Sequence, residues 1–428
     1  MRKLDGNLYI RKRAASEWAV AFVFFLPFFQ AFFAEFLGLP DILKFLADVA
    51  LFFLLVKIVL ISRQIQIGKF LYPFLFLIGI FIGYVTVTYF MNYQSVFYYI
   101  WGLRNYFRFY LAFVCYVIFL PWDNVQTWFK VLDRLYVINF FVVMVQFFMG
   151  YRQDFLGGIF GISKGCNGGV LVFLTVVLTK VILDFMRNEG STIKCLVFSS
   201  MGLLISALSE LKFFFVIFIG ILIMATVMTK SSVKKTLFLF FGVVLIIVLS
   251  TLLSVLYDDF SDFLSIKNLW NSLINPNYAT DEDVGRMTAI PIISERFLPN
   301  FMDKLLGIGI GNADSSSIGI FNTPFYDMYG DLHYAIFLYA FLYLETGIIG
   351  LSLYTLFFVI AFVTSFYLYK TKKGAETICQ LAMIFSVSCI AFMFYNVALR
   401  SEMAAYLAFF VLALPLISAG ETTLKEDI

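Results

Sequence analysis

The sequence predicts an all-α polytopic membrane protein with about 12 transmembrane helices and one large extracytoplasmic loop between late spans. Hydrophobic residues make up 61% of the 428 residues, and only 14% are charged. The mean hydropathy is +0.90. A soluble chain of this length could not bury so much apolar surface. One long polar stretch, from Tyr257 to about His333, interrupts the apolar pattern and ends on the only histidine.

The spans are predicted from apolar segments, since crossing a bilayer takes about 20 apolar residues. The seventh and eighth segments are short and are joined by Glu210, Leu211 and Lys212, which predicts a helical hairpin with a tight outer turn. The tenth is too long for one straight crossing, and Gly347 and Gly350 predict a kink or a close helix contact there. The segments lie near 18–38, 43–61, 70–90, 105–120, 135–150, 166–186, 195–209, 213–229, 236–256, 334–369, 376–395 and 403–418.

The orientation follows from lysine and arginine, which concentrate in cytoplasmic loops. A cytoplasmic amino terminus places most basic residues inside and the large loop in the periplasm or outside the cell. We therefore expect a transmembrane bundle of about nine spans over 1–256 and a large extracytoplasmic loop over 257–333. The C-terminal transmembrane helices then occupy 334–418, and 419–428 forms a cytoplasmic tail.

The basic residues that this topology leaves outside are rich in arginine. Six of the eleven are arginine, whereas lysine outnumbers arginine by 14 to 6 on the inner side. Arginine binds phosphate or carboxylate oxygens in two places and stays charged when partly dehydrated. This bias predicts an anionic ligand with a lipid tail, such as a lipid-linked phosphate or pyrophosphate. Alternatively, these arginines reach lipid headgroups or pair with outer carboxylates. The eleven are Lys44, Arg104, Arg108, Arg152, Lys164, Lys212, Lys267, Arg286, Arg296, Lys304 and Arg400.

Two arginine pairs are candidates for binding the anion. Arg104 and Arg108 are four residues apart and share one face of the helix that enters the fourth span. Arg286 and Arg296 form the second pair, at the start of and within the stretch 287–306, which is predicted to form one or two amphipathic helices on the membrane surface.

His333 is the candidate for acid–base chemistry because it opens the tenth span at the water–lipid boundary. A neutral imidazole can accept a proton from a sugar hydroxyl, and a charged one can stabilise a phosphate. The alternative is an interfacial residue that caps a helix. Glu345 lies twelve residues further on, about 18 Å along a continuous helix, and so cannot touch His333. A carboxylate at that depth needs a partner, for which Arg104 and Arg108 are the candidates.

A glycine-rich stretch, 306–312, does not predict a nucleotide site. It lacks the lysine of a phosphate-binding loop, does not match GxGxxG and has no βαβ context. Gly309 and Gly311 instead fit a turn where the backbone approaches a ligand or the helix below. The acidic runs at 258–262 and 281–283 are interpreted as solvated surface. No cysteine pair or carboxylate spacing predicts a metal, so we expect neither a metal nor a cofactor.

Taken together, these features resemble the bacterial surface-polysaccharide (O-antigen) polymerase and ligase family, which is Wzy-like. The order of the resembling segments, with the large loop between late spans, is the most diagnostic part. These segments are 102–108, 159–161, 207–212, 285–286, 306–311, and His333 followed by 344–350.

The resemblance implies a GT-C-like, metal-independent glycosyltransferase of the bacterial inner membrane whose donor is an oligosaccharide linked to undecaprenyl pyrophosphate. It assigns catalytic roles to His333 and Arg286. It also implies that outer basic residues bind the pyrophosphate. These are Arg104, Arg108, Arg296 and Lys212.

The polymerase branch is favoured over the ligase branch by two positions. The family often has asparagine after the loop histidine, where this chain has Tyr334, and arginine in the hairpin turn, where it has Lys212. We therefore expect a polymerase of O-antigen, capsule or exopolysaccharide repeat units, possible partners being a chain-length regulator and other assembly proteins. An O-antigen ligase acting on lipid A core, a lipid-linked sugar flippase and a structural partner in an assembly complex are the alternatives. The net charge of +3 gives no indication of nucleic-acid binding.

Overall fold

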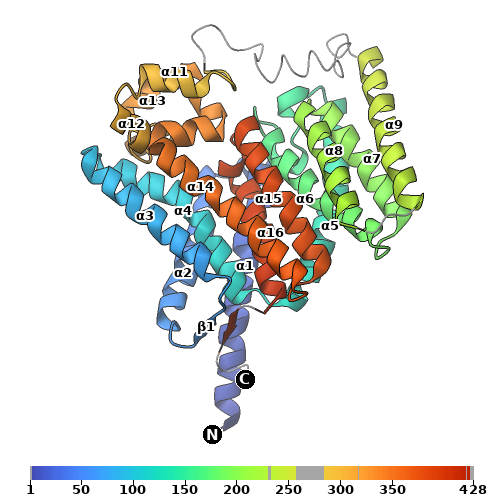
Figure 1. Cartoon of the computed structure of the whole chain (residues 1–428), viewed down its shortest axis with the longest axis horizontal. Coiled ribbons are helices and arrows are strands. Elements are labelled where there is room, and N and C mark those ends of the chain that lie inside the picture. Colours follow the sequence, from blue (N-terminus) through green and yellow to red (C-terminus); the bar gives the residue numbers. More distant parts are fainter. Residues whose placement is uncertain (1, 230–232, 257–283, 317, 421, 425–428) are drawn as a thin grey trace.

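Long apolar segments form helices in lipid because a helix satisfies its own backbone hydrogen bonds. The computed structural model describes residues 2–229, 233–256, 284–316, 318–420 and 422–424 (Figure 1). Within them, each predicted span overlaps one helix. These helices are α1 (Arg2–Phe36), α2 (Phe45–Leu60), α3 (Tyr72–Met91), α4 (Val96–Phe119), α5 (Trp122–Phe148), α6 (Asn167–Met186), α7 (Thr192–Leu208), α8 (Lys212–Val227), α9 (Val233–Leu256), α14 (Leu338–Lys370), α15 (Glu376–Tyr395) and α16 (Glu402–Ser418).

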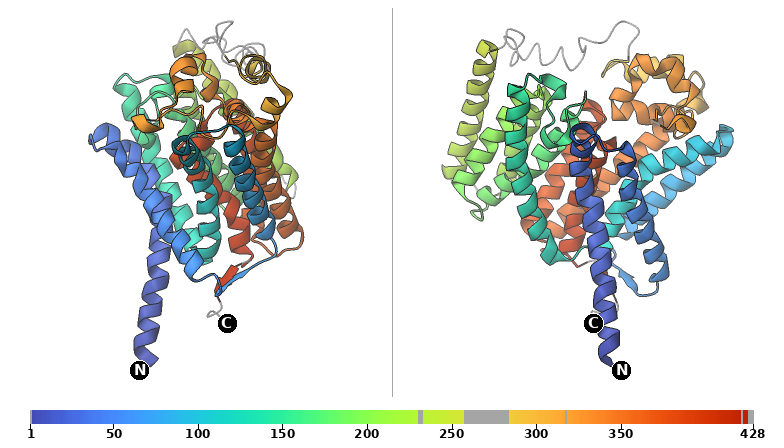
Figure 2. Two further views of the ribbon diagram at one scale, coloured as in Figure 1. Left: turned by 90° about the vertical axis from the view of Figure 1, so that its left-hand side faces the viewer. Right: turned by 180° about the vertical axis from the view of Figure 1, so that it is seen from behind.

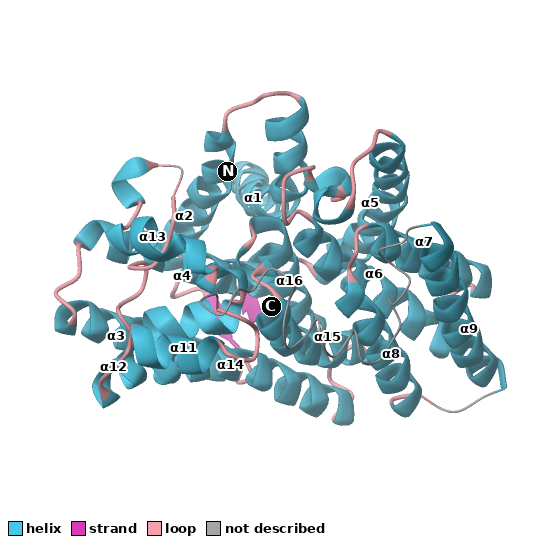
Figure 3. Cartoon of the chain, turned by 90° about the horizontal axis from the view of Figure 1, so that it is seen from above, coloured by secondary structure: helices cyan, strands magenta, loops and turns pink. Residues whose placement is uncertain are grey.

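Six helices in the described part of the chain are long and apolar enough to cross a membrane. They are α1 from Ala15 onward, α3, α5, α6, α14 and α15. Shorter apolar helices are α7, α8, the 235–249 part of α9, and α16. The class predicted from the sequence, an all-α membrane protein, is therefore supported. Seen from above, α15 and α16 lie toward the middle of the bundle, with α3 and α9 at its two sides (Figure 3).

Several helices begin earlier than the apolar segments that predicted them. The helix α4 starts at Val96 although the predicted apolar segment begins near 105, and α5 starts at Trp122 although its predicted segment begins near 135. Hydropathy identifies only the apolar part of a helix, whereas the backbone hydrogen bonds of the helix continue into the polar residues on either side. For this reason Arg104 and Arg108 lie inside α4.

The predicted kink in the tenth span is confirmed at Gly347. This residue has φ +60° and ψ −169° within α14, so the helix changes direction there. The glycine stretch packs directly against the kink. The amides of Ile308 and Gly309 donate to the carbonyls of Leu344 and Glu345, at 3.0 and 2.9 Å. The expectation that backbone in this stretch approaches a helix is therefore confirmed.

A small cap, made of the short helices between α9 and α14, lies over one side of one end of the bundle (Figure 1). Two helices form within the stretch where one or two amphipathic helices were expected, α11 (Ala289–Arg296) and α12 (Phe301–Leu306). Short elements follow: η5 (Gly319–Phe321), α13 (Pro324–Tyr329), η6 (Gly330–Leu332) and η7 (Tyr334–Ile336). The acidic runs at 258–262 and 281–283 lie outside the described residues.

The start of α1 and the strand β2 (Thr422–Leu424) lie at the end of the bundle opposite the cap (Figures 1 and 2). There a two-stranded antiparallel sheet joins β1 (Ile65–Ile67) to β2 (Thr422–Leu424), with Ile65 opposite Leu424. This sheet is an addition to the all-helical expectation. The remaining short helices are η1 (Asp41–Lys44), η2 (Gln153–Phe155), η3 (Gly158–Phe160) and η8 (Ala398–Arg400).

Replacement of Gly347 by alanine should destabilise the protein by about 1–3 kcal/mol, because a side chain is strained at this backbone conformation. A Cβ there would also overlap the Leu305 carbonyl oxygen. Thermal unfolding in detergent measures the effect. Gly79→Ala is the matched control, since a Cβ at Gly79 has no atom within 4 Å and should leave stability unchanged or slightly raised. Equal melting temperatures for the two variants would contradict this account of the kink.

Candidate functional site

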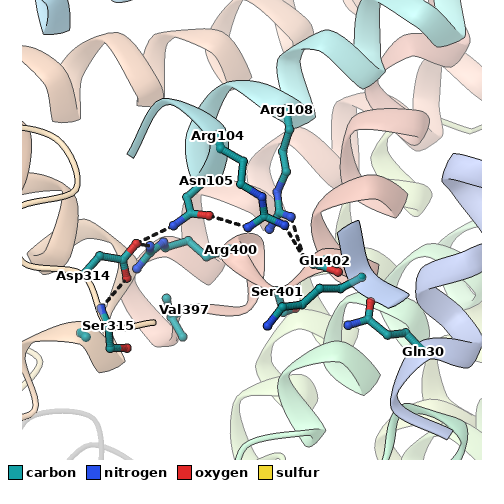
Figure 4. Close-up of a pocket in the computed structure, with 12 residues that line it drawn as sticks. Gln30, Arg104, Asn105, Arg108, Asp314, Ser315, Val397, Arg400, Ser401 and Glu402 are labelled. Atoms are coloured by element: carbon teal, nitrogen blue, oxygen red, sulfur yellow. Dashed lines mark hydrogen bonds and ion pairs between the residues drawn. The ribbon is translucent and has the colours of Figure 1, made fainter. Parts of the chain in front are cut away.

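A polar cavity of about 490 Å³ lies where the cap meets the bundle (Figure 4). Its wall combines residues from α1, η1, α4, the loop after the glycine stretch, η7 and the connection between α15 and α16. Segments that are far apart in the sequence therefore meet here. The lining residues are Gln30, Lys44, Arg104, Asn105, Arg108, Asp314, Ser315, Ala335, Val397, Arg400, Ser401 and Glu402.

Arg104 and Arg108 share one face of α4, as predicted, and both contact carboxylates. Arg104 donates from Nη2 and Nε to Asp48 Oδ2, at 2.6 and 2.8 Å. Arg108 donates from Nη1 to Glu402 Oε1 at 2.6 Å, and Arg104 Nη2 lies 3.4 Å from the same oxygen. The ring of Trp101 lies 4.9 Å from the Arg104 guanidinium carbon. These contacts hold both guanidinium groups in fixed positions at the cavity.

Arg400 forms a second ion pair in the same cavity. Its Nη2 donates to Asp314 Oδ2 at 2.6 Å, and its guanidinium carbon lies 4.0 Å from the centre of the Phe341 ring. Burial alone would lower the pKa of Arg400, but its neighbours, Asp314 first and then Tyr106 and Glu345, together outweigh that effect, and the pKa lies above its usual value. Arg400 therefore stays a cation although its side chain is only 15% exposed.

Asn105 joins the two ion-pair groups into one network. Its Oδ1 accepts from Arg104 Nη1 at 2.9 Å, and its Nδ2 donates to Asp314 Oδ2 at 2.6 Å (Figure 4). Four cations line the cavity: Lys44, Arg104, Arg108 and Arg400. With all groups ionised they exceed the three carboxylates of the network by one positive charge. The arrangement favours an anion that can share or replace those carboxylates.

Three charged groups of this network retain hydrogen-bonding capacity. Within the part of the chain that the structure describes, the buried atoms Asp48 Oδ1, Arg108 Nε and Glu402 Oε2 have no hydrogen-bond partner. Leaving such an atom unsatisfied costs about 1–3 kcal/mol, so these charges are held at a cost to stability.

Glu345 is fully buried and has partners other than those suggested by the sequence. Its Oε2 accepts from the Tyr106 hydroxyl at 3.0 Å, and its Oε1 accepts from the Ala313 amide at 3.1 Å. The expectation that Arg104 or Arg108 would pair with it is wrong. Tyr106 lies two residues from Arg104, and hence on nearly the opposite face of α4. Glu345 therefore positions the loop that precedes Asp314 instead of facing the arginines.

The two glycines proposed as possible site residues shape the same loop. A Cβ on Gly311 would overlap the Tyr98 carbonyl oxygen, and one on Gly309 would lie 2.7 Å from Gln94 Oε1. Both have positive φ, +81° and +100°. Glycine at these positions lets the loop lie against α4 and carry Asp314 into the cavity.

Arg286 and Arg296, predicted from the cap, do not line the cavity. The Arg286 Nε donates to the Tyr395 carbonyl at 3.3 Å, and its guanidinium carbon lies 4.9 Å from the centre of the Tyr395 ring. Arg286 therefore contacts Tyr395, the last residue of α15, which directly precedes the connection that carries Arg400. Arg296 is exposed at the end of α11.

Lys212 and His333 also lie outside the cavity wall. Lys212 pairs with Glu210 at 3.0 Å in the hairpin turn between α7 and α8, a turn that the sequence predicted. His333 is exposed, has a left-handed backbone with φ +60° and donates its amide to the Gly330 carbonyl. Ala335, two residues after it, lines the cavity. The assigned roles of these residues remain predictions.

The sequence did not predict four charged residues of this network as site residues. Arg400 was expected only to be one of the outward basic residues, and no role was predicted for the carboxylates Asp48, Asp314 and Glu402. One signal was present: Arg400, Ser401 and Glu402 form a polar interruption between the last two apolar segments. Charged groups between spans need partners, and such an interruption indicates a site.

No family model and no curated protein sequence matches this chain. Among the described residues, no three His, Cys, Asp or Glu side chains are grouped so that they could hold a metal ion.

Glu345→Ala should lower the free energy of unfolding by about 1–3 kcal/mol for each donor left without an acceptor. Glu345→Gln should be much milder, because an amide oxygen can accept from Ala313 and the amide group can donate to the Tyr106 hydroxyl. Thermal unfolding in detergent compares the two variants. A glutamine variant as unstable as the alanine variant would show that this hydrogen bonding is not what Glu345 contributes.

Proposed function

We propose that this protein is a membrane glycosyltransferase that polymerises lipid-linked oligosaccharide repeat units. It transfers the glycan from undecaprenyl pyrophosphate to an acceptor sugar hydroxyl at the outer membrane face. One observation carries the proposal: Arg104, Arg108 and Arg400 converge on one cavity at the end of the bundle that bears the cap. The resemblance to the surface-polysaccharide polymerase family supplies the substrate class.

The arginines suit a pyrophosphate leaving group. Guanidinium groups bind phosphate oxygens through paired hydrogen bonds and keep their charge when partly buried. Arg104, Arg108 and Arg400 all line the cavity. Charge grows on the pyrophosphate as the anomeric bond breaks, and fixed cations stabilise that charge in the transition state.

The proposal includes a topology of twelve crossings with a GT-C-like arrangement in a bacterial inner membrane. Support comes from the overlap of each predicted span with one helix and from the position of the start of α1 and of β2 opposite the cap. In this arrangement the cap faces the periplasm or the exterior, beside the cavity. A chain-length regulator and other polysaccharide assembly proteins are the proposed partners.

His333 and Arg286 act from the cap side in this proposal. His333 belongs to the segment that leads to Ala335 in the cavity wall, from where it orients or deprotonates the acceptor hydroxyl. Arg286 packs against Tyr395 and so supports the connection that carries Arg400. Arg296 and Lys212 contact lipid-linked substrate outside the cavity.

A lipid-linked sugar flippase is the second candidate. Ionisable groups buried among spanning helices also mark transport pathways, and the network around Arg108 and Glu402 is of this kind. An O-antigen ligase would use the same donor site and differ only in its acceptor, the lipid A core. The acceptor therefore has to be tested separately from the donor.

The double variant Arg104→Gln with Arg108→Gln should lose 10²-fold or more of polymerisation rate, since removing even one such charge-stabilising donor costs about 10²–10³-fold. The assay supplies purified protein with a lipid-pyrophosphate oligosaccharide and records the ladder of products. Arg152→Gln is the matched control, because Arg152 is an exposed outward arginine bonded to the backbone of Phe147. Wild-type ladders from the double variant would refute the anion site.

Arg286→Ala and His333→Ala should each shorten the polymer that is made in cells at matched protein levels. The His333 substitution removes a group that acts on the acceptor sugar. The Arg286 substitution removes a contact that supports the connection between α15 and α16, which carries Arg400. Polymer length on gels is the measurement. Full-length polymer from both variants would remove these residues from the mechanism. Accumulation of unpolymerised repeats that never reach the outer face would instead favour the flippase.

A further inference from the structure

We propose that Asp314 is the catalytic residue that accepts the proton of the acceptor sugar hydroxyl. This inference rests on the proposed glycosyl transfer and assigns its general base, with His333 left to orient the acceptor. It is drawn from the position of Asp314 in the cavity, its free acceptor capacity and the way that its loop is held.

The cavity has two chemically different ends. Arg104 and Arg108 lie beside Glu402 at one end, and Asp314 lies with Ser315 and Arg400 at the other (Figure 4). In a single displacement, the leaving group and the incoming hydroxyl occupy opposite faces of the anomeric carbon. A pyrophosphate held by Arg104 and Arg108 therefore directs the acceptor hydroxyl toward Asp314.

The Asp314 carboxylate retains room for one more donor. Its Oδ2 accepts from Asn105 Nδ2 and Arg400 Nη2, both at 2.6 Å, and its Oδ1 accepts from the Ser315 amide at 3.0 Å. A carboxylate has about four acceptor positions, and three of them are filled. The fourth is available to a hydroxyl in the cavity.

The loop that carries Asp314 is held from several sides. The Asp314 carbonyl accepts from the Thr323 hydroxyl at 3.0 Å. The neighbouring Ala313 accepts from the Tyr334 hydroxyl at 2.8 Å and donates its amide to Glu345. A base that is already oriented loses little entropy when the substrate binds, which is a large part of its catalytic value.

The other candidate bases are less well placed. Glu402 Oε1 lies between Arg104 and Arg108, and so belongs to the end of the cavity that holds the leaving group. His333 is exposed and is not part of the cavity wall.

The proposed step balances in atoms and charge. The hydroxyl O–H bond breaks and the proton passes to Asp314 Oδ1, while the sugar oxygen forms a bond to the anomeric carbon. The bond from that carbon to the phosphate oxygen breaks, and its electron pair leaves with the pyrophosphate. Asp314 then releases the proton to water. Arg400 stays charged throughout, because a guanidinium is not deprotonated in proteins even when Asp314 is transiently neutral.

The test uses the full-length purified protein and the lipid-pyrophosphate oligosaccharide. Asp314→Asn should slow ladder formation by about 10²–10⁴-fold, the usual contribution of a general base, with the affinity for the donor unchanged. Asp314→Glu should recover part of the rate. Asp327→Asn is the matched control, because Asp327 is an exposed carboxylate of α13 outside the cavity and should polymerise normally.

Wild-type ladders from Asp314→Asn, with Arg104→Gln and Arg108→Gln still inactive, would overturn the assignment of the base and leave the transferase intact. Absence of a ladder from the wild-type protein would refute the transferase itself, and this inference with it. The two failures are therefore distinguishable.

The pH profile of the rate, compared between the wild-type protein and His333→Gln, provides a second test. A histidine base would add an acidic limb to the profile, because only the neutral imidazole accepts a proton. We expect the two profiles to have the same shape. The charged or titratable groups around Asp314 are Arg400, Tyr106, Glu345 and Tyr334. An acidic limb that disappears in His333→Gln would assign the base to His333 and overturn the proposal.

Discussion

The pairing of arginines with carboxylates in the polar cavity is the constraint on which the arrangement of the cap end of the bundle depends. A charge removed from water without a partner costs several kcal/mol, so each guanidinium in the network needs an oxygen at a defined distance. Asp48 on α2, Glu402 at the start of α16 and Asp314 on the loop supply those oxygens. These ion pairs link α2, α4, α16 and the loop that carries Asp314.

The second constraint is the kink at Gly347, which determines where Asp314 lies. The interrupted helix exposes carbonyls to which Ile308 and Gly309 donate, and the loop then continues past Gly311 against α4. Glu345, next to the kink, accepts from Ala313 and fixes the residue before Asp314. Through these hydrogen bonds, the kink at Gly347 sets the position of the Asp314 carboxylate in the cavity.

The proposed chemistry follows from the arrangement of the charged groups within the cavity. Arg104 and Arg108 at one end suit a departing diphosphate, and Asp314, which pairs with Arg400 at the other end, suits an incoming hydroxyl. The carboxylates of the network pair with the arginines, which stabilises the buried charges. A diphosphate would take over part of that role, since it offers more acceptor oxygens than Glu402 or Asp48.

The sequence by itself determined the class of the protein, its helical segments, the tight turn at Glu210 and the kink at Gly347. It also placed Arg104 and Arg108 on one face of a helix. These features depend on hydropathy, helical period and glycine, which act over a few neighbouring residues. Only the tertiary structure decided which charges pair, because Arg104 and Asp48 are 56 residues apart and Arg108 and Glu402 are 294 apart. Such partners are set by how the helices pack. No local pattern records that packing, and so Arg400 and Asp314 emerged as site residues only once the helices were in place.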